Sequence, residues 1–269
     1  MRFVTMATDS FSPGAIALIQ SIIENSGFDK ENIEFTVLSV DGFTPKTKDH
    51  FHQLPVEIDI VSVESLGEFG FDSELLEEEY KREIQNKFLL FKLPYNENIC
   101  YIDADQLCLN EITAVSEFKP FTAVMNIGKE NSESINNRPM FNTGLFVCNP
   151  SSDLFDEIQE FAKRIDQEMM YADQRILNEF FYSRYPESVN LLAQNWNVVT
   201  SNKYHQRKLW KHVKSQGVKF LHFTSIKPWF VNHRKPPARF RFHRYKYPLY
   251  RKEVKTWESY FQRALQHAE

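Results

Sequence analysis

The stretch NICYIDAD (residues 98–105) places two carboxylates directly after a short apolar run. The run predicts a buried strand, so Asp103 and Asp105 stand at its carboxyl end. Carboxylates two residues apart on an extended chain point the same way and can hold a hard divalent cation that also binds a diphosphate. A turn in which the aspartates cap backbone groups is the alternative. The position at a strand end favours the metal site.

The segments before this stretch alternate between strand and helix patterns. Ser12-Pro13 predicts a helix start, with Ser12 as the cap and Pro13 in the first turn. Residues 73–92 are also predicted to be helical. Strands that alternate with helices predict a mostly parallel sheet covered on both faces, with ligands at the carboxyl ends of the strands. The patterns read RFVTMA (2–7, strand), AIALIQSIIEN (15–25, helix), IEFTVLSVDG (33–42, strand) and VEIDIVSV (56–63, strand).

The later half of the chain mixes strands and helices. The tail from residue 231 is basic, aromatic and rich in proline, so we expect irregular structure up to about residue 250 and then an amphipathic helix over 254–265. The other predicted elements are FTAVMNI (121–127), FNTGLFVCN (141–149) and KFLHFT (219–224) as strands, and SSDLFDEIQEFAKRI (151–165) and DQRILNEFFYS (173–183) as helices.

Composition and charge narrow the class of protein. The chain has 269 residues, 42% hydrophobic and 25% charged, which is ordinary for a globular domain. It has no apolar run of membrane-spanning length, no signal-peptide pattern and three cysteines without a CxxC pair, so we expect a cytoplasmic protein with reduced thiols. The net charge is −4, yet no acidic residue lies between Glu187 and Glu253. This basic segment predicts an anionic partner (a nucleotide diphosphate, nucleic acid or acidic lipid) unless it packs on the acidic face of its own domain.

Three further motifs carry polar groups that suit a binding site. His222 in FLHFTSIKPW (220–229) can complete a carboxylate-rich metal site, and Lys227 can reach phosphate oxygens. Asn142 and Thr143 in FNTG (141–144) can bond sugar hydroxyls, and Asp173-Gln174 opens an apolar helix. Each motif also has a structural alternative: a satisfied histidine, a turn, or a helix cap.

The order and spacing of these motifs resemble glycosyltransferase family 8, the glycogenin-like retaining glycosyltransferases. The similarity spans residues 1–230 and runs through MATDSFSPGA (6–15), Lys87, the DAD triplet, FNTG, the DQ helix and HFTSIKPW (222–229). It implies a GT-A type nucleotide-diphospho-sugar transferase fold, which is an α/β fold with a Rossmann-like, mostly parallel mixed sheet flanked by helices.

The resemblance also implies roles for individual residues. Asp103, Asp105 and His222 would bind the metal, usually Mn2+ with Mg2+ as the alternative. Lys87 and Lys227 would neutralise the diphosphate, and Asp173 and Gln174 would act at the reacting carbon. Ser225 replaces the glycine of the family, which puts its backbone contact with phosphate in doubt. The remaining donor-binding residues would be Ala7, Thr8 and Phe11 around the uracil and ribose, Ala104 beside the metal, and Asn142 and Thr143 at the sugar.

The function implied is that of a metal-dependent retaining glycosyltransferase. It would move glucose or galactose from a UDP-sugar to a hydroxyl acceptor on a glycan, a protein-linked glycan or a lipid-linked saccharide. Two alternatives stay open. One is a self-glucosylating, glycogenin-like protein with Tyr204 as the acceptor, and the other is a non-catalytic basic protein that binds nucleic acid or a membrane.

The expected organisation is a catalytic domain over residues 1–230 and a basic, aromatic extension over 231–269. Residues 231–252 are predicted to close as a lid over bound nucleotide, or the extension contacts an anionic membrane or the acceptor. Permanent packing on the acidic residues 74–80 is the alternative. We expect no nucleic-acid partner, a cytoplasmic location that includes the membrane periphery, and an open oligomeric state with a homodimer among the alternatives.

Overall fold

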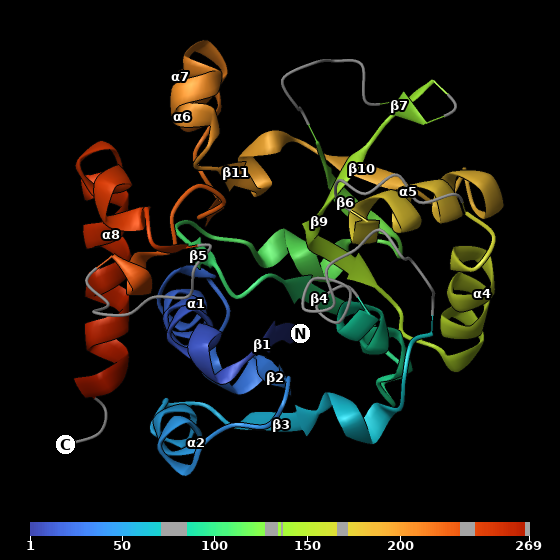
Figure 1. The fold of residues 1–269 in the computed structure, drawn as a ribbon, viewed down its shortest axis with the longest axis horizontal. Helices are drawn as coiled ribbons and strands as arrows, with labels where there is room; N and C mark the ends of the chain where they lie inside the picture. Colours follow the sequence, from blue (N-terminus) through green and yellow to red (C-terminus); the bar gives the residue numbers. More distant parts are fainter. Residues whose placement is uncertain (71–84, 127–133, 136, 166–171, 232–239, 267–269) are drawn as a thin grey trace.

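A seven-stranded mixed sheet forms the centre of the molecule (Figure 1). The computed structural model describes residues 1–70, 85–126, 134, 135, 137–165, 172–231 and 240–266. The strands lie in the order β10 (Asn190–Leu192), β6 (Thr122–Met125), β9 (Phe141–Cys148), β4 (Ile99–Ile102), β1 (Arg2–Ala7), β2 (Glu34–Ser39) and β3 (Ile58–Ser62). Strand β9 is antiparallel to both neighbours, and the other adjacent strands pair in parallel. The predicted mostly parallel mixed sheet is confirmed.

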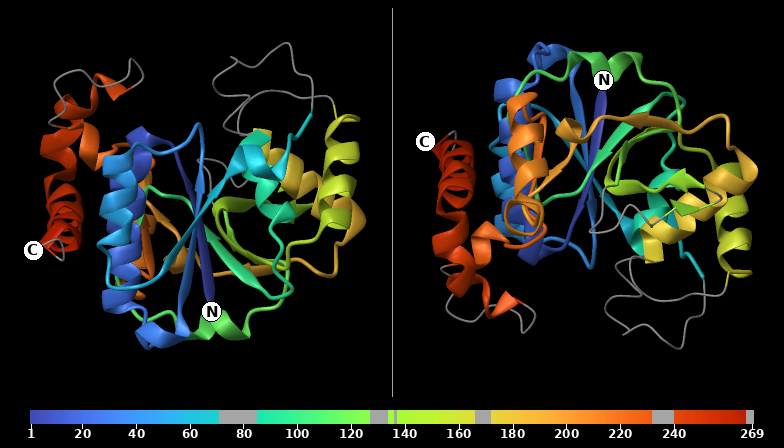
Figure 2. Two further views of the ribbon diagram at one scale, coloured as in Figure 1. Left: turned by 90° about the horizontal axis from the view of Figure 1, so that it is seen from below. Right: turned by 90° about the horizontal axis from the view of Figure 1, so that it is seen from above.

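Helices cover both faces of this sheet (Figure 2). One face carries α1 (Ser12–Asn25), and α8 (His243–Gln266) lies outside α1 on the same side. The other face carries α4 (Ser152–Ala162) and α5 (Ala172–Arg184). The described part of the chain also contains α2 (Pro45–His52), α6 (Asn202–His205) and α7 (Arg207–Ser215).

Strand β4 shows why its sequence is continuously apolar. Successive side chains of a strand point to opposite faces of the sheet. Cys100 and Ile102 pack in the cluster that contains α1, whereas Ile99 and Tyr101 pack with residues of α4 and α5. Both faces of β4 are therefore buried, and its carboxyl end delivers Asp103 to the edge of the sheet.

A second, three-stranded sheet brings the late histidine to the aspartates. It consists of β11 (Val198–Val199), β12 (Phe220–His222) and β5 (Gln106–Cys108), and a small hairpin pairs β7 (Ser134–Ile135) with β8 (Arg138–Pro139). Strands β12 and β5 are antiparallel, with His222 opposite Gln106. This register places His222 beside Asp105, although Gln106 and His222 are 116 positions apart along the chain.

The start of α1 differs in one detail from the prediction. Phe11 occupies the cap position, and Ser12 lies inside the helix, where its hydroxyl donates to the Asp9 carbonyl (2.8 Å). The prediction of Ser12 as the cap was wrong, because the 3-10 turn at Asp9–Phe11 already leads the chain into the helix. Pro13 stands in the first turn as predicted.

The C-terminal tail is more regular than its prolines indicated. Helix α8 begins at His243 and continues past Pro248, with a kink at Tyr250 (φ −114°, ψ 17°). The expectation of irregular structure up to residue 250 was therefore wrong from His243 onward. A proline bends a helix by removing a donor and crowding the preceding turn, and the chain accepts this bend because Val254 and Trp257 are buried in the same cluster as Ala17 of α1.

Other predictions lie partly or wholly outside the described residues. Within the predicted helix 73–92, residues 85–88 are helical and Leu89–Lys92 form a 3-10 turn. Packing of the tail on residues 74–80 lies outside the described part of the chain. All three cysteines are reduced and buried. No helix among the described residues has the length and apolar character needed to cross a bilayer.

Candidate active site

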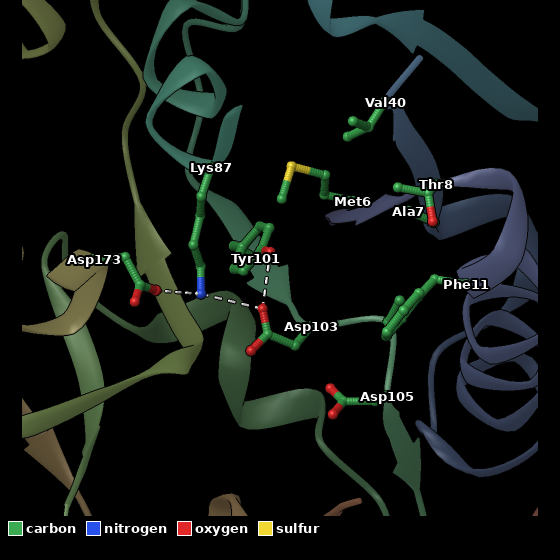
Figure 3. Close-up of a pocket in the computed structure, with 11 residues that line it drawn as sticks. Met6, Ala7, Thr8, Phe11, Val40, Lys87, Tyr101, Asp103, Asp105 and Asp173 are labelled. Carbon is green, nitrogen blue, oxygen red and sulfur yellow. Dashed lines mark hydrogen bonds and ion pairs between the residues drawn. The ribbon is translucent and has the colours of Figure 1, made fainter. Parts of the chain in front are cut away.

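A pocket opens at the carboxyl ends of β1, β2 and β4 (Figure 3). Strand β1 has its sequence successor β2 on one side and the later strand β4 on the other, so the strand order reverses here. Open α/β sheets bind ligands at such reversal points. The pocket is lined by Met6, Ala7, Thr8, Phe11, Val40, Lys87, Tyr101, Asp103, Ala104, Asp105 and Asp173.

Two aspartates and a histidine meet at one side of the pocket. Ligand atoms of Asp103, Asp105 and His222 all lie within 4.8 Å of one another. The Nε2 atom of His222 is 3.1 Å from Asp105 Oδ1 and 3.9 Å from Asp103 Oδ2. The chain thus brings together the three residues that the sequence predicted as metal ligands.

A chain of amides fixes the orientation of His222. Asn197 donates to Asn142 Oδ1 (2.7 Å), which turns its own Oδ1 toward His222 Nδ1 (3.1 Å). The Nδ1–H of His222 therefore donates to Asn197, and the Nε2 atom faces the aspartates. A hydrogen bond of this kind behind a histidine is what prepares the ring for metal ligation.

Gly144 gives a second indication that the cluster is built for an ion. A Cβ atom at position 144 would come within 2.7 Å of the His222 ring and 2.9 Å of Asp103 Oδ2. Only glycine leaves room for His222 and Asp103 at their observed places. Two carboxylates and an imidazole form a donor set that suits Mn2+ or Mg2+, so the residues present fit a divalent cation.

Lys87 connects Asp103 of this cluster to Asp173 (Figure 3). Its ammonium is 2.9 Å from Asp173 Oδ2 and 3.2 Å from Asp103 Oδ1. Burial lowers the pKa of Lys87, but the negative charges of Asp103 and Asp173 outweigh burial and raise it overall. Burial likewise raises the pKa of Asp173, and Lys87 outweighs it, so that pKa lies below its usual value. Both groups are therefore charged at neutral pH.

Lys227 makes the corresponding contact at the metal side. Its ammonium pairs with Asp105 Oδ2 and also donates to the Phe223 carbonyl (2.9 Å). Burial raises the pKa of Asp105, but His222 and Lys227 outweigh burial and hold that pKa far below its usual range. The pocket therefore carries ionised carboxylates with a lysine at each side.

The aromatic wall of the pocket is formed by Phe11. Its ring makes edge contacts with Trp229, Phe230 and Phe240, at centroid distances of 5.3, 5.9 and 5.8 Å. Ala7 and Thr8 continue this wall from the end of β1. The predicted base-binding residues are thus neighbours, and Phe11 is braced by rings from the loop after β12 and from the tail.

Several predicted residues lie behind the pocket wall. Asn142 donates to Gln174 Oε1 (3.0 Å), and Thr143 donates to Asp173 Oδ2 (2.9 Å). Gln174 is buried, so Asp173 is the member of that pair that lines the pocket. The backbone N–H of Ser225 donates to Thr200 Oγ1 (3.3 Å). The predicted contacts of these residues with the donor stay predictions.

Sequence reasoning missed four residues of the site. Met6, Val40 and Tyr101 line the pocket, and Asn197 supports His222. Tyr101 donates to Asp103 Oδ1 (2.9 Å), and burial, reinforced by the charge of Asp103, raises the pKa of its hydroxyl well above the ordinary value. The polar tip of Tyr101 inside an otherwise apolar strand was the one available signal. Met6 and Val40 look like ordinary core residues, and Asn197 lies in a segment without a pattern.

Comparison with known proteins defines the class. The structure is similar to the galactosyltransferase LgtC in complex with donor and acceptor sugar analogues, with TM-score 0.67, 18% identity and coverage of 97% of this chain and 95% of that chain. It is also similar to mouse xyloside xylosyltransferase 1, with TM-score 0.57, 14% identity and coverage of 83% of this chain and 97% of that chain. These likenesses confirm the GT-A fold of the nucleotide-sugar transferases.

The family follows from the sequence match. The model of glycosyl transferase family 8 matches residues 3–233, so the chain belongs to this family and is a glycosyltransferase. A relative from Arabidopsis thaliana, UDP-glucuronate:xylan alpha-glucuronosyltransferase 1, is 27% identical over 146 residues, covering 54% of this chain and 20% of the relative. A second relative from the same plant, named putative UDP-glucuronate:xylan alpha-glucuronosyltransferase 4, is 24% identical over 242 residues, covering 85% of this chain and 36% of the relative. The chain spans well under half the length of these curated relatives.

Proposed function

We propose that this glycosyltransferase is metal-dependent and retaining, and that it moves glucose or galactose from a UDP-sugar to a hydroxyl acceptor. The observation that carries the proposal is the cluster of Asp103, Asp105 and His222 at the wall of a pocket that also holds the Lys87–Asp173 pair. A cation held by the cluster supplies positive charge for the diphosphate when bound.

The charges of the pocket support the binding of a UDP-sugar. A leaving diphosphate gains negative charge as its bond to the sugar breaks, and fixed cations offset that charge. Lys227 lies at the metal side and Lys87 at the side of Asp173, so a donor between them meets a cation at each end. Phe11 offers a ring face for the base, and Asp173 offers an acceptor for sugar hydroxyls.

The reaction proposed proceeds on one face of the sugar. The acceptor hydroxyl attacks the anomeric carbon from the side on which the diphosphate leaves, the carbon–oxygen bond to UDP breaks, and a phosphate oxygen takes the hydroxyl proton. Asp173 and Gln174 would orient the sugar and stabilise the oxocarbenium-like state, because both are held in place by Lys87, Thr143 and Asn142. No protein nucleophile is required by this route.

A donor screen tests the proposal directly. UDP release is measured with UDP-glucose, UDP-galactose, UDP-glucuronate and UDP-xylose, with excess chelator and then with Mn2+ or Mg2+ added back. We expect release from UDP-glucose or UDP-galactose that stops on chelation and returns with the metal. Asp105→Asn serves as the matched inactive control, since it keeps shape and removes a ligand charge.

The outcomes separate the parts of the proposal. Equal turnover with excess chelator would overturn the metal role. Turnover with UDP-glucuronate alone would overturn the proposal that the transferred sugar is the uncharged glucose or galactose. The donor would then match the one in the names of the plant relatives. Proton NMR of the product reads the anomeric configuration, and inversion would overturn retention.

Self-glucosylation at Tyr204 is the weaker alternative. The Tyr204 hydroxyl donates to the Leu249 carbonyl (2.9 Å), and its ring packs edge-on against Tyr250. The hydroxyl of Tyr204 therefore faces helix α8, and Tyr204 does not line the pocket. Intact-mass measurement after incubation with UDP-glucose and Mn2+ checks it, and we expect no increase in multiples of a hexose.

The outer face of the tail favours a further partner, an anionic membrane surface at which the acceptor would lie. Phe242, Tyr245 and Leu249 are exposed by 68%, 65% and 47%, and Arg241 and Lys246 beside them are also exposed. Aromatic and basic side chains on one face suit an anionic interface. Sedimentation with anionic and neutral liposomes, for the wild type and for a Phe242→Ser/Tyr245→Ser variant that leaves the buried face of α8 intact, tests this contact. Binding that does not depend on salt, or that is the same in the variant, would overturn it. Closure of residues 231–252 over nucleotide, and a homodimer, stay predictions.

A further inference from the structure

Four polar side chains form one hydrogen-bonded chain that begins at the metal cluster. In order from the metal side, its members are His222, Asn197, Asn142 and Gln174. Asn197 accepts from the Nδ1–H of His222 (3.1 Å) and donates to Asn142 Oδ1 (2.7 Å). Asn142 in turn donates to Gln174 Oε1 (3.0 Å). His222, Asn197 and Gln174 are buried, so a bond lost from this chain leaves a buried polar group without a partner.

The backbone of Gly144 sets the direction of this chain. Its N–H, which can only donate, donates to Asn142 Oδ1 (2.8 Å). Asn142 must therefore keep its oxygen on that side and turn its Nδ2 toward the oxygen of Gln174. By the same rule, Asn197 presents its Nδ2 to Asn142 and its Oδ1 to His222. Reversal of any one amide would place oxygen against oxygen or N–H against N–H.

The fold holds both ends of the chain of amides. The Gly144 carbonyl accepts from the backbone N–H of Asp103 (2.9 Å), so the same residue also fixes the main chain at a predicted metal ligand. At the other end, Asn178 of α5 donates to the carbonyls of Phe141 (2.9 Å) and Gln174 (2.7 Å). Its Oδ1 accepts from the Phe141 N–H (2.8 Å). These bonds join β9 to the first turn of α5, where the chain of amides ends.

We infer that Asn197 is a positioning residue for both parts of the site: it orients His222 for the metal and, through Asn142, fixes the orientation of Gln174. Asn197 is not among the residues that line the pocket, so it acts through these neighbours. The inference rests on the proposed function, because it takes the cluster as a metal site and Gln174 as a contact to the donor sugar. Groups that the fold already orients lose less conformational freedom when the donor binds.

Two substitutions at Asn197 separate its two roles. Asn197→Asp keeps an oxygen acceptor for the Nδ1–H of His222 and removes the donor to Asn142. Asn197→Leu removes both bonds. Asn195→Asp is the matched control, because it makes the same change two positions earlier, where the side chain donates to the Gly217 carbonyl (3.1 Å).

Three measurements on the whole chain report on the two ends of the chain of amides. Mn2+ titration followed by electron paramagnetic resonance gives the Kd of the metal alone. Nuclear magnetic resonance without a donor follows proton exchange of the Asn142 side-chain amide. Steady-state release of UDP from UDP-glucose and from UDP-galactose, at saturating Mn2+, gives kcat.

The two variants should differ in metal affinity. Asn197→Asp should keep the Kd for Mn2+ within about threefold of the wild type, whereas Asn197→Leu should raise it by about 10- to 100-fold. The carboxylate of Asn197→Asp should repel Asn142 Oδ1, so the Asn142 amide exchanges faster and kcat falls by about 10- to 100-fold. Asn195→Asp should change none of the three values. General damage to the fold would instead weaken Mn2+ binding in both variants at position 197.

Other results overturn the inference. An equal loss of Mn2+ affinity in Asn197→Asp and Asn197→Leu would show that the oxygen of Asn197 does not orient His222. Wild-type exchange at Asn142, or a wild-type kcat, in Asn197→Asp would show that the chain of amides does not fix Gln174. If the wild-type protein binds Mn2+ but releases UDP from neither donor, the proposed function fails. Mn2+ titration and amide exchange then still decide whether Asn197 positions its neighbours.

Discussion

The molecule has two clusters in which a lysine pairs with carboxylates, and they differ in which partner is the more buried. At the pocket, Lys87 is more buried than its partners: its side chain is 9% exposed, against 26% for Asp103 and 19% for Asp173. In the tail, the acid is the more buried partner, with Glu253 at 7% and Lys203 at 24%. Lys203 contacts both oxygens of Glu253, whereas Asp103 turns its Oδ2 toward His222.

The difference indicates which cluster is available for a ligand. In the tail pair, Lys203 donates to both carboxylate oxygens of Glu253 and to the Leu249 carbonyl, so these bonds are made within the fold itself. The pocket cluster shares one lysine between two acids and leaves Asp103 facing a cavity that Asp105 also lines. Polar groups that are satisfied within the fold stabilise it, and groups aimed at a cavity predict function.

Removal of the pocket lysine should lower the activity far more than removal of the tail lysine. Lys87→Met leaves Asp103 and Asp173 without their shared cation, and we expect kcat/KM for the UDP-sugar to fall by about 10²- to 10³-fold. Lys203→Met should lower it by no more than about tenfold, because Lys203 does not line the pocket. Steady-state kinetics on both variants checks this, and equal losses would contradict the distinction between the clusters.

The metal side of the pocket can be tested without removing any charge. Gly144→Ala places a methyl group against His222 and Asp103, and we expect Mn2+ affinity to fall by about 10- to 100-fold. Gly70→Ala is the matched control, because among the described residues the nearest atom to its added carbon lies at 3.9 Å. Mn2+ titration followed by electron paramagnetic resonance measures the affinity, and similar values for the two variants would weaken the assigned ligand set.

The tail pair should show its effect in stability. Lys203→Met leaves the buried carboxylate of Glu253 without a partner, and we expect the free energy of unfolding to fall by about 2–3 kcal/mol, less than for a fully buried pair. The double variant Lys203→Met/Glu253→Leu should recover most of this loss, since no buried charge remains. Urea unfolding measures both, with Lys211→Met on the exposed face of α7 as the control. A double variant as unstable as the single one would contradict the expectation.

The smallest expected effect is on the stability of the protein at acidic pH, and it comes from the Lys87–Asp173 pair. Because the pKa of Asp173 is depressed in the folded protein, its contribution to stability is complete above the unfolded pKa of about 3.9 and is lost as pH falls through the folded value. Lys87, whose pKa is raised, loses its contribution only at strongly alkaline pH. Between pH 5 and 3, Asp173→Asn should therefore lose less stability than the wild type. Parallel acid curves would show that Asp173 is not held ionised by Lys87.

Much of the fold could be predicted because local pattern and tertiary burial agree. The strand before Asp103 is apolar on both faces and reads as a buried strand, and α1 carries apolar residues on a helical period. Helix α2 was missed because eight residues with Phe51 and Thr47 buried give little periodic signal, although Thr44 caps it by accepting from the Thr47 N–H. The helix through Pro248 was missed because packing on α1 overrides the local preference.

The ionisable residues of the candidate site were predicted from the sequence, whereas the role of Asn197 and the space that Gly144 leaves for His222 and Asp103 were not. The sequence signal came from ionisable residues next to apolar strands, because burial of a charged group costs free energy unless the group is paired or binds a ligand. These residues are Lys87, Asp103, Asp105 and His222. Asn197 and Gly144 act through orientation and space, which depend on the antiparallel pairing of β12 with β5 and on the approach of β9. A single sequence contains no measure of such distances.

The three cysteines have a practical consequence for spectroscopy of this enzyme. Cys100, Cys108 and Cys148 are all buried, and burial raises the pKa of the Cys108 thiol to about 12 and those of the other two still further. Alkylating dyes react with thiolates, so the native chain is expected to stay unlabelled under mild conditions. A single exposed thiol made by Tyr245→Cys on α8 would then take a fluorophore selectively. The wild-type background is thus already suitable for single-molecule measurements, without a cysteine-free variant.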